Sequence, residues 1–189
     1  MSERRNINER LDELGALLAS EDLRTGKGLM NEENIRIFDY SPEDEMAVRR
    51  FVKMIESNKS DYGDVKVFNL FDVFLNLCND CASVEDIVAE EEYSGSEYIL
   101  EIMQDFADNK SIVNKMLDLG MNDAAVVVLT GLGEIYPIAR LHLLLSALQP
   151  YRDSKAVVAL YPGEFTGEQV KLFNKLAPSN YYRAIGVIK

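Results

Sequence analysis

Cysteine and histidine are scarce in this sequence, and their scarcity excludes several kinds of site. The chain of 189 residues has two cysteines and one histidine, whereas a structural zinc site needs four ligands and no second cysteine pair is present. Cys78 and Cys81 have the spacing of a redox pair, but they lie well inside a helical pattern. A reactive thiolate is stabilised where a helix starts just after a strand. We therefore expect two small, partly buried thiols.

Long apolar runs are also missing. No run approaches the roughly 18 residues of a membrane span. Residues 1–20 are charged and amphipathic, without the apolar region of a signal peptide. Two cysteines without such a signal are typical of a reducing compartment. The expected location is the cytoplasm, with no membrane contact.

The motifs that bind nucleotides are incomplete. No GxxxxGK[ST] string occurs, and residues 25–28 (TGKG) have Gly28 where a hydroxyl should stand. The apolar run that ends at Thr130 is followed by Gly131-Leu132-Gly133, but Tyr136 occupies the place of the third glycine of a dinucleotide fingerprint. We interpret the glycines as a tight connection from a strand to a helix. Weak anion binding at the start of that helix is the other interpretation, and no cofactor is predicted.

Basic residues are outnumbered, with 20 Lys and Arg against 32 Asp and Glu and a formal charge of −12. Since nucleic-acid binding neutralises phosphates with Lys and Arg, this charge argues against direct DNA binding. A local basic excess near the C-terminus, with Lys171, Lys175 and Arg183, keeps DNA contact as a third hypothesis.

The acidic charge is concentrated in one region. Between Cys81 and Asn109 there are nine acidic residues and no Lys or Arg. The region is either a solvated helical face or a surface for a basic partner. The candidate partner-binding residues are Glu90, Glu91, Glu92, Glu97 and Glu101.

The order of the apolar patterns predicts an α/β fold. Five strands are expected at residues 35–40, 65–70, 124–130, 155–161 and 181–188. Helices are expected at residues 6–20, 42–57, 71–119, 135–148 and 166–176, with breaks near Ser83 and at residues 93–95. This alternation indicates a mainly parallel sheet with helices on both faces, a Rossmann-like or degenerate NTPase-like three-layer sandwich. We expect one domain over residues 1–189, with residues 71–120 as a helical excursion between the second and third strands.

Ligands of open parallel sheets bind beyond the carboxyl ends of the strands. Three segments are expected at those ends: residues 39–40, 130–133 and 161–163. Asp39 is followed by the acidic residues 43–45, a set that can bind magnesium or can simply stabilise the start of a helix. The candidate ligand pocket comprises Lys27, Asn31, Glu32, Asp39, Gly131, Gly133, Tyr136 and Arg140.

The single histidine fits a structural position better than a catalytic one. In the predicted helix, His142 shares an apolar face with Ile135, Ile138 and Leu145. A core histidine with one hydrogen-bond partner is the favoured interpretation. With no second histidine and no nucleophile beside it, a catalytic triad cannot be assembled.

Five segments together resemble one protein family. They are residues 26–32 (GKGLMNE), 38–45 (FDYSPEDE), 129–150 (LTGLGEIYPIARLHLLLSALQP), 161–173 (YPGEFTGEQVKLF) and 180–185 (NYYRAI). In this order they resemble the BrxB family, small accessory proteins of bacterial bacteriophage-exclusion (BREX) defence systems. The resemblance implies a system that also contains a large ATPase, an adenine methyltransferase and the alkaline-phosphatase-like protein PglZ. It assigns no catalytic role to any residue.

Besides direct DNA contact, the sequence supports two hypotheses of function. The leading one is a non-enzymatic assembly subunit that docks another defence protein, with PglZ as the expected partner and the acidic region as the docking surface. The alternative is a ligand-sensing or metal-dependent enzymatic module. That alternative requires the candidate pocket residues to converge at the carboxyl edge of the sheet.

Overall fold

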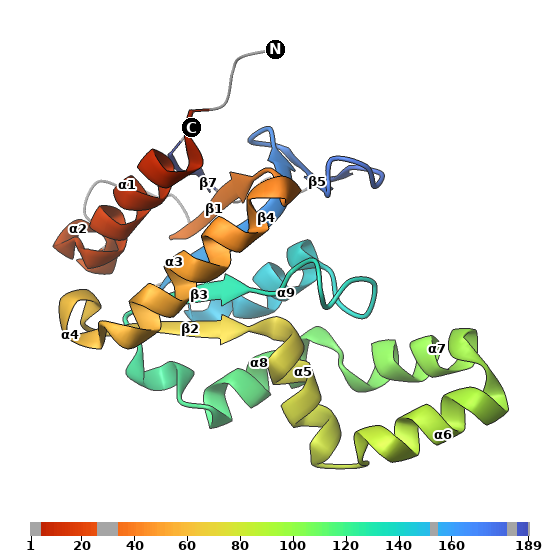
Figure 1. Cartoon of the computed structure of the whole chain (residues 1–189). Coiled ribbons are helices and arrows are strands. Elements are labelled where there is room, and N and C mark those ends of the chain that lie inside the picture. Colours follow the sequence, from red (N-terminus) through yellow and green to blue (C-terminus); the bar gives the residue numbers. More distant parts are fainter. Residues whose placement is uncertain (1–4, 26–33, 152–154, 181–184, 189) are drawn as a thin grey trace.

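The computed structural model describes residues 5–25, 34–151, 155–180 and 185–188. A parallel sheet crosses the molecule (Figure 1). Its strands lie in the order β2 (Val65–Asn69), β3 (Val126–Thr130), β4 (Ala156–Phe165), β1 (Ile35–Tyr40) and β7 (Ile185–Gly186). The strands β5 (Gln169–Leu172) and β6 (Ser179–Asn180) add an antiparallel extension to β4. The α/β class and the mainly parallel sheet are confirmed.

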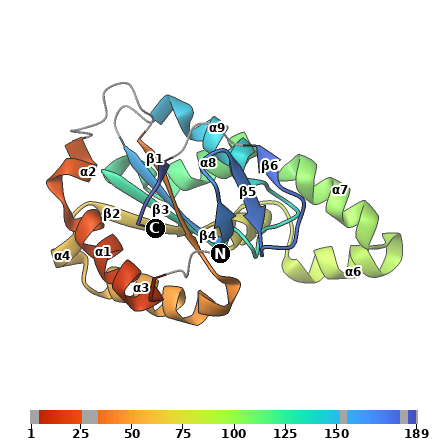
Figure 2. The ribbon, with the colours of Figure 1, turned by 90° about the horizontal axis from the view of Figure 1, so that it is seen from above.

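Helices cover both faces of this sheet. In chain order they are α1 (Ile7–Ala19), α2 (Glu21–Thr25), η1 (Pro42–Asp44), α3 (Glu45–Ser57), α4 (Lys59–Tyr62), α5 (Leu70–Asn79), α6 (Val84–Ser94), α7 (Ser96–Phe106), α8 (Asn109–Asp118), η2 (Met121–Asp123), α9 (Leu141–Leu148) and η3 (Gln149–Tyr151). Seen from above, α1 and α3 lie on one side of the sheet, and α8 and α9 lie on the other (Figure 2).

The segment from α5 to α8 is the predicted helical excursion, and its breaks have clear causes. α5 ends at Asn79, and Ser83 begins the next helix with a capping box, in which Ser83 and Asp86 exchange hydrogen bonds. Gly95 allows the next break because its φ is +87°. A further break, not predicted, precedes α8, where Asp108 accepts a hydrogen bond of 2.7 Å from the Ser111 N–H.

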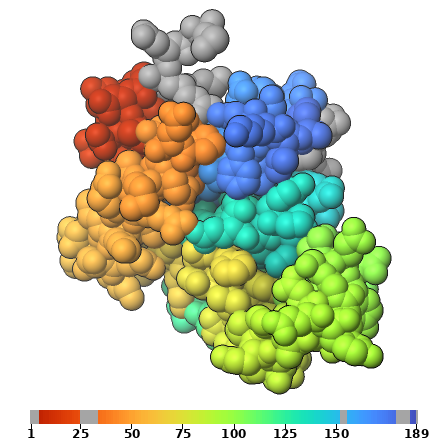
Figure 3. Space-filling model, turned by 45° about the vertical axis from the view of Figure 1, so that its right-hand side comes forward, coloured from red at the N-terminus to blue at the C-terminus, as the bar shows by residue number. Residues whose placement is uncertain are grey.

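Helices α6 and α7 form a projecting hairpin, which we call the arm (residues 84–106). It stands away from the sheet and its covering helices (Figure 3). In α6 no residue is buried, and in α7 only Ile99 is. Every other helix of eight or more residues among the described ranges buries at least three side chains.

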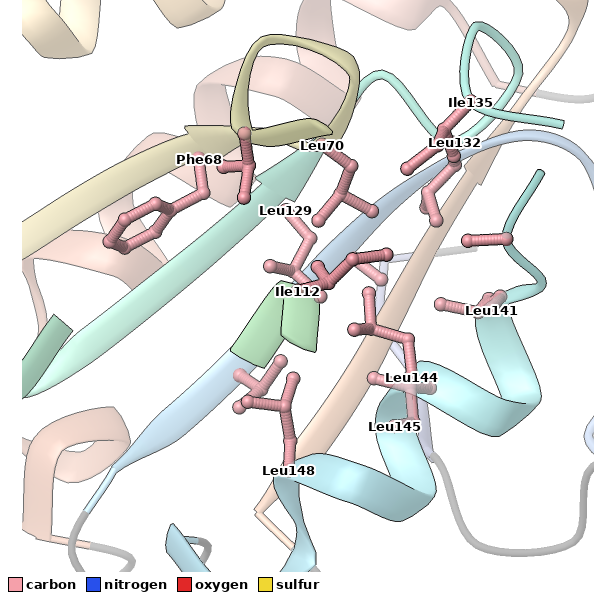
Figure 4. Close-up of a cluster of buried hydrophobic side chains, with 14 of the residues drawn as sticks. Phe68, Leu70, Ile112, Leu129, Leu132, Ile135, Leu141, Leu144, Leu145 and Leu148 are labelled. Carbon is pink, nitrogen blue, oxygen red and sulfur yellow. The ribbon is translucent and has the colours of Figure 1, made fainter. Parts of the chain in front are cut away.

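Two core clusters lie on opposite faces of the sheet. In β3, Val126 and Val128 belong to the cluster that includes side chains of α1 and α3, whereas Val127 and Leu129 belong to the cluster with α5, α8 and α9. Figure 4 shows Leu129 among side chains of the second cluster. Burial on both faces explains why the strand is a continuous apolar run.

The predicted helix at residues 166–176 is wrong. Residues 169–172 instead form β5, which pairs with β4 and buries Val170 and Leu172 on alternate positions. The turn is made by Gly167, with φ +100°, and by the Thr166 hydroxyl, which accepts a hydrogen bond from the Gln169 N–H. Because β4 continues to Phe165, residues 161–163 are not a strand end.

The predicted helix at residues 135–148 begins only at Leu141. Residues 131–140 form successive turns, in which the Gly131 carbonyl accepts from Glu134 and Ile135. Pro137, which follows a cis peptide bond, has no N–H to donate to a carbonyl four residues earlier. The expected apolar helical face around His142 therefore does not exist. For the last predicted strand, residues 181–184 lie outside the described residues.

A buried arginine joins α1 to the sheet and to the last described residue. The Arg10 guanidinium is 3% exposed and donates to the carbonyl oxygens of Asp39 (2.8 Å) and Ile188 (2.8 and 2.9 Å). It also lies 3.3 Å from the Asp39 carboxylate and 4.7 Å from the centre of the Phe38 ring. These contacts hold three segments that are far apart in the sequence.

Replacing Arg10 by Met should lower the free energy of unfolding by about 3 kcal/mol, because the Asp39 carboxylate and two carbonyl groups lose a buried donor. Urea denaturation followed by circular dichroism measures the change. Arg5→Met is the matched control, since Arg5 pairs with Glu13 on the surface and exposed pairs contribute little. Equal midpoints for the two variants would contradict the role assigned to Arg10.

Candidate functional site

Side chains of the protein occupy the space beside the two glycines of the turn after β3. A Cβ atom on Gly131 would lie 2.3 Å from the Asn69 Oδ1, and the φ of Gly131 is +72°. A Cβ atom on Gly133 would lie 2.7 Å from the ring of Phe173 and 3.3 Å from Pro162. Both glycines are needed for these close approaches. The geometry favours the interpretation as a tight connection.

The Asn69 oxygen has a structural task of its own. It caps α5 by accepting hydrogen bonds from the N–H groups of Phe71 (2.9 Å) and Asp72 (3.3 Å). The turn at Gly131 therefore packs directly on the first turn of the helix that leads to the arm.

A polar cleft of about 450 Å³ lies beside this turn, at the carboxyl ends of β2 and β3. The Arg49 side chain donates to Glu45 (2.8 Å) and to Glu134, and Asn69 donates to Glu134 over 3.2 Å. Tyr40 donates to Glu45 over 2.7 Å, and burial together with this bond raises the pKa of the Tyr40 hydroxyl. Three of the charged side chains that line the cleft, Glu45, Arg49 and Glu134, are thus paired within the protein.

Those predicted ligand-pocket residues that the structure describes do not converge in this cleft. Gly131 lines it, but Tyr136 and Arg140 line a separate pocket with Tyr161 and Leu172. Asp39 lines neither of these two pockets. Its carboxylate accepts a hydrogen bond from the Phe165 N–H (3.2 Å) and faces the Arg10 guanidinium. Gly133 packs on Phe173. Lys27, Asn31 and Glu32 lie outside the described residues.

Three residues that meet at the cleft, Arg49, Asn69 and Glu134, were not predicted from the sequence. Arg49 and Glu134 are 85 positions apart, and neither belongs to a recognisable motif. Of the residues at the cleft, Asn69 could have been found from the sequence, because it stands directly before a helix and asparagine is a good N-cap residue.

The other titratable groups have structural explanations. Burial lowers the pKa of His142, and the positive charge of Arg140 lowers it further, so that the imidazole is neutral at neutral pH. Burial raises the pKa of the Cys78 thiol. Cys78 is buried and Cys81 is exposed, which differs from the expected pair of partly buried thiols because α5 ends at Asn79.

Metal ligands and membrane spans were also sought in the described part of the chain. Within it, no group of three or more His, Cys, Asp or Glu side chains is placed to hold a metal ion. Glu45 of the predicted acidic set is instead bonded to Tyr40 and Arg49. None of the described helices combines the length and the apolar character that crossing a bilayer requires.

The arm carries all five acidic residues predicted to bind a partner. Glu90, Glu91, Glu92, Glu97 and Glu101 are all exposed. The same two helices also expose large apolar side chains, namely Val84, Val88, Tyr93, Tyr98 and Ile102. Tyr93 is 90% exposed. Acidic and apolar groups thus share one projecting unit.

The fold and these sites define an α/β protein with a polar cleft at its sheet edge and an acidic helical arm. A sequence profile described as "BREX protein BrxB" matches residues 66–187. The chain belongs to the BrxB family of BREX proteins. The BREX protein BrxB of Bacillus cereus (strain H3081.97) is 33% identical over 189 residues, with 97% of this chain and 98% of the relative covered. The BREX protein BrxB of Escherichia coli O9:H4 (strain HS) is 26% identical over 185 residues, with 96% and 92% covered. No solved structure matches the chain.

Gly131→Ala should destabilise the protein by about 2–3 kcal/mol, because alanine meets both an unfavourable φ and the Asn69 side chain. Gly95→Ala is the control, since its φ is also positive but nothing lies within 4 Å of the added Cβ. That control should lose less, about 1–2 kcal/mol, because only its backbone conformation is strained. Urea unfolding measures both. Losses of equal size would show that the contact with Asn69 contributes nothing.

Proposed function

We propose that this chain is a non-enzymatic assembly subunit of a BREX defence system, and that it docks another BREX protein through the arm. The phosphatase-like PglZ is the expected partner. The observation that carries the proposal is the exposure of the arm, whose helices present large apolar side chains to solvent and bury only Ile99. Several large apolar side chains exposed on one projecting unit favour an interaction site there.

The energetics of the arm support a partner. Its helices are 11 residues each, and isolated helices shorter than about 12–15 residues are marginal in water. The capping box at Ser83 stabilises the start of α6, but packing contributes little further along. Binding that covers Val88 and Tyr98 would add the burial that these helices lack.

The charge of the arm indicates the chemistry of the partner. The arm holds eight of the nine acidic residues between Cys81 and Asn109, and no Lys or Arg in that segment balances them. A partner with a basic surface would be attracted over about 10 Å at 0.1 M salt. Association should therefore slow as salt is added.

The polar cleft gives less support for the alternative of an enzymatic module. Its Arg49 and Glu134 side chains are paired with each other, and Glu45 is paired with Arg49 and Tyr40. A catalytic acid or base needs a proton-transfer partner in the substrate. Side chains that are already bonded within the protein are better suited to holding α3 against the turn after β3.

Charge reversal on the arm should abolish docking. Full-length tagged protein is expressed in cells that carry the complete defence gene cluster, and retained proteins are identified by mass spectrometry at low and moderate salt. The wild type should retain one BREX protein stoichiometrically. The variant Glu90→Lys, Glu91→Lys, Glu92→Lys should retain less than about a tenth as much, since charge pairs across an interface are lost and reversed.

A second triple reversal controls for net charge. Glu9, Asp12 and Asp118 are exposed and lie outside the arm, so reversing them changes the formal charge from −12 to −6, as the arm variant does. Retention should survive this change. Equal loss in both variants, or retention of no BREX protein by the wild type, would refute docking through the arm.

A further inference from the structure

An apolar groove runs between the base of the arm and the end of α5. Its volume is about 360 Å³, near the lower end of the range of small-molecule pockets, so it offers room for apolar side chains of a partner rather than for a whole helix. Its lining comes from the end of α5 and the residues just after it, with Cys78 and Cys81, and from both helices of the arm. Ile87, Met103 and Phe106 also pack on the core cluster that includes side chains of α5, α8 and α9, which we call the main core cluster. The floor of the groove is therefore held against the rest of the protein.

One face of α7 supplies most of the large apolar side chains that line the groove. From α7 the groove receives Ile99, Ile102, Met103 and Phe106, which follow the spacing i, i+3, i+4, i+7 of one helical face. Grooves of this kind accept an amphipathic helix that inserts its apolar face. Methionine adapts to the shape of an incoming side chain.

The rim of the groove is acidic. Asp86 and Glu90 line it from α6. The Ser83 hydroxyl and N–H hold the Asp86 carboxylate at 2.7 and 3.2 Å and lower its pKa, so it remains ionised at neutral pH. No Lys or Arg lies between Cys81 and Asn109 to neutralise this rim from within the segment.

We propose that the groove binds an amphipathic helix of the partner protein, with apolar side chains on one face and Lys or Arg along its flank. The proposal rests on the docking function proposed above and specifies the element that is bound. A second copy of this chain is a poorer occupant, because a symmetric contact between two arms would place like charges opposite each other.

Cys81 provides a native reporter for occupancy of the groove. It is the exposed one of the two cysteines, and it lines the groove together with the buried Cys78. An uncharged reagent such as N-ethylmaleimide should modify Cys81 rapidly in the free full-length chain. A helix seated in the groove should slow that reaction about tenfold, since reactivity depends on access to the thiol. Peptide mass spectrometry separates the two thiols.

The test uses three synthetic peptides of about 16 residues, a length that spans roughly 24 Å as a helix. The first carries Leu on one helical face and Lys on the flanks, the second has the same composition in an order without helical periodicity, and the third replaces Lys with Glu. The first peptide should bind and protect Cys81. The second and third should bind at least about tenfold more weakly.

A matched pair of variants locates the peptide. Ile102→Asp, in the groove, should weaken binding of the Leu/Lys helix about tenfold or more, since it places a charge on an apolar contact surface. Met54→Asp is the control on α3. The two side chains have similar exposure, 43% and 41%, so both substitutions should leave the fold intact, as circular dichroism can verify.

The outcomes separate the groove from the docking function. Equal binding of the two Lys peptides, unprotected Cys81, or equal effects of both variants would overturn the groove as a helix site, even where the arm still retains a BREX protein. These measurements use the isolated chain. Retention of no BREX protein in the pull-down would instead refute the docking function, whatever the peptides do.

Discussion

Burial of β3 and β4 on both faces is the constraint on which the rest of the structure depends. A strand that places Val126 and Val127 in different core clusters needs a layer of helices on each side. The chain supplies α1 and α3 for one face and α5, α8 and α9 for the other. Each of these helices is positioned by the apolar stripe that it buries. The arm is the one long helical unit in the described ranges that is not used in this way.

The second consequence concerns the carboxyl edge of the sheet. In open α/β sheets, ligands bind where neighbouring connections leave toward opposite faces. Here the connection from β1 leads to α3, and that from β3 leads to α9, on the other face. β4, which lies between them, extends past the edge and turns back as β5, and its Phe165 N–H bonds to the Asp39 carboxylate. Phe173, just after β5, packs on Gly133. The chain thus covers part of the edge where a nucleotide binds in related layouts.

The sequence was most informative where local pattern and tertiary burial agree. Strand β1 occupies its predicted residues, because IRIFDY is bounded by polar residues and buries Ile35 and Ile37 in one core cluster and Phe38 and Tyr40 in the other. Predictions of helix were wrong where tertiary pairing decided the outcome. Val170 and Leu172 fit a helix as well as a strand by composition, and only pairing with β4 selects the strand. The helix predicted for residues 135–148 includes Pro137, but proline has no N–H to donate, and the helix begins only at Leu141.

The candidate sites also differ in how far their residues lie apart in the sequence, and this separation decided which sites could be predicted. The acidic content of the arm is a property of consecutive residues, so composition was enough to find it. The contacts of Glu134 with Arg49 and Asn69 join segments that are 85 and 65 positions apart, and no local pattern encodes them. Separation in the sequence also hid the groove, since Cys81 and Phe106 become neighbours only when α6 and α7 fold back on each other.

The arm combines a firmly held base with an open tip. At its base, Ile87 and Met103 pack on the main core cluster, whereas at its tip Tyr93 is almost fully exposed and nothing approaches the Cα of Gly95 on its side-chain side. A binding surface whose floor is already ordered loses less conformational entropy when a partner arrives. The groove lies at the ordered base, and the acidic residues extend from it toward the tip. In the docking that we propose, the charge of the whole arm would attract the partner, and binding would take place where the arm packs on the core.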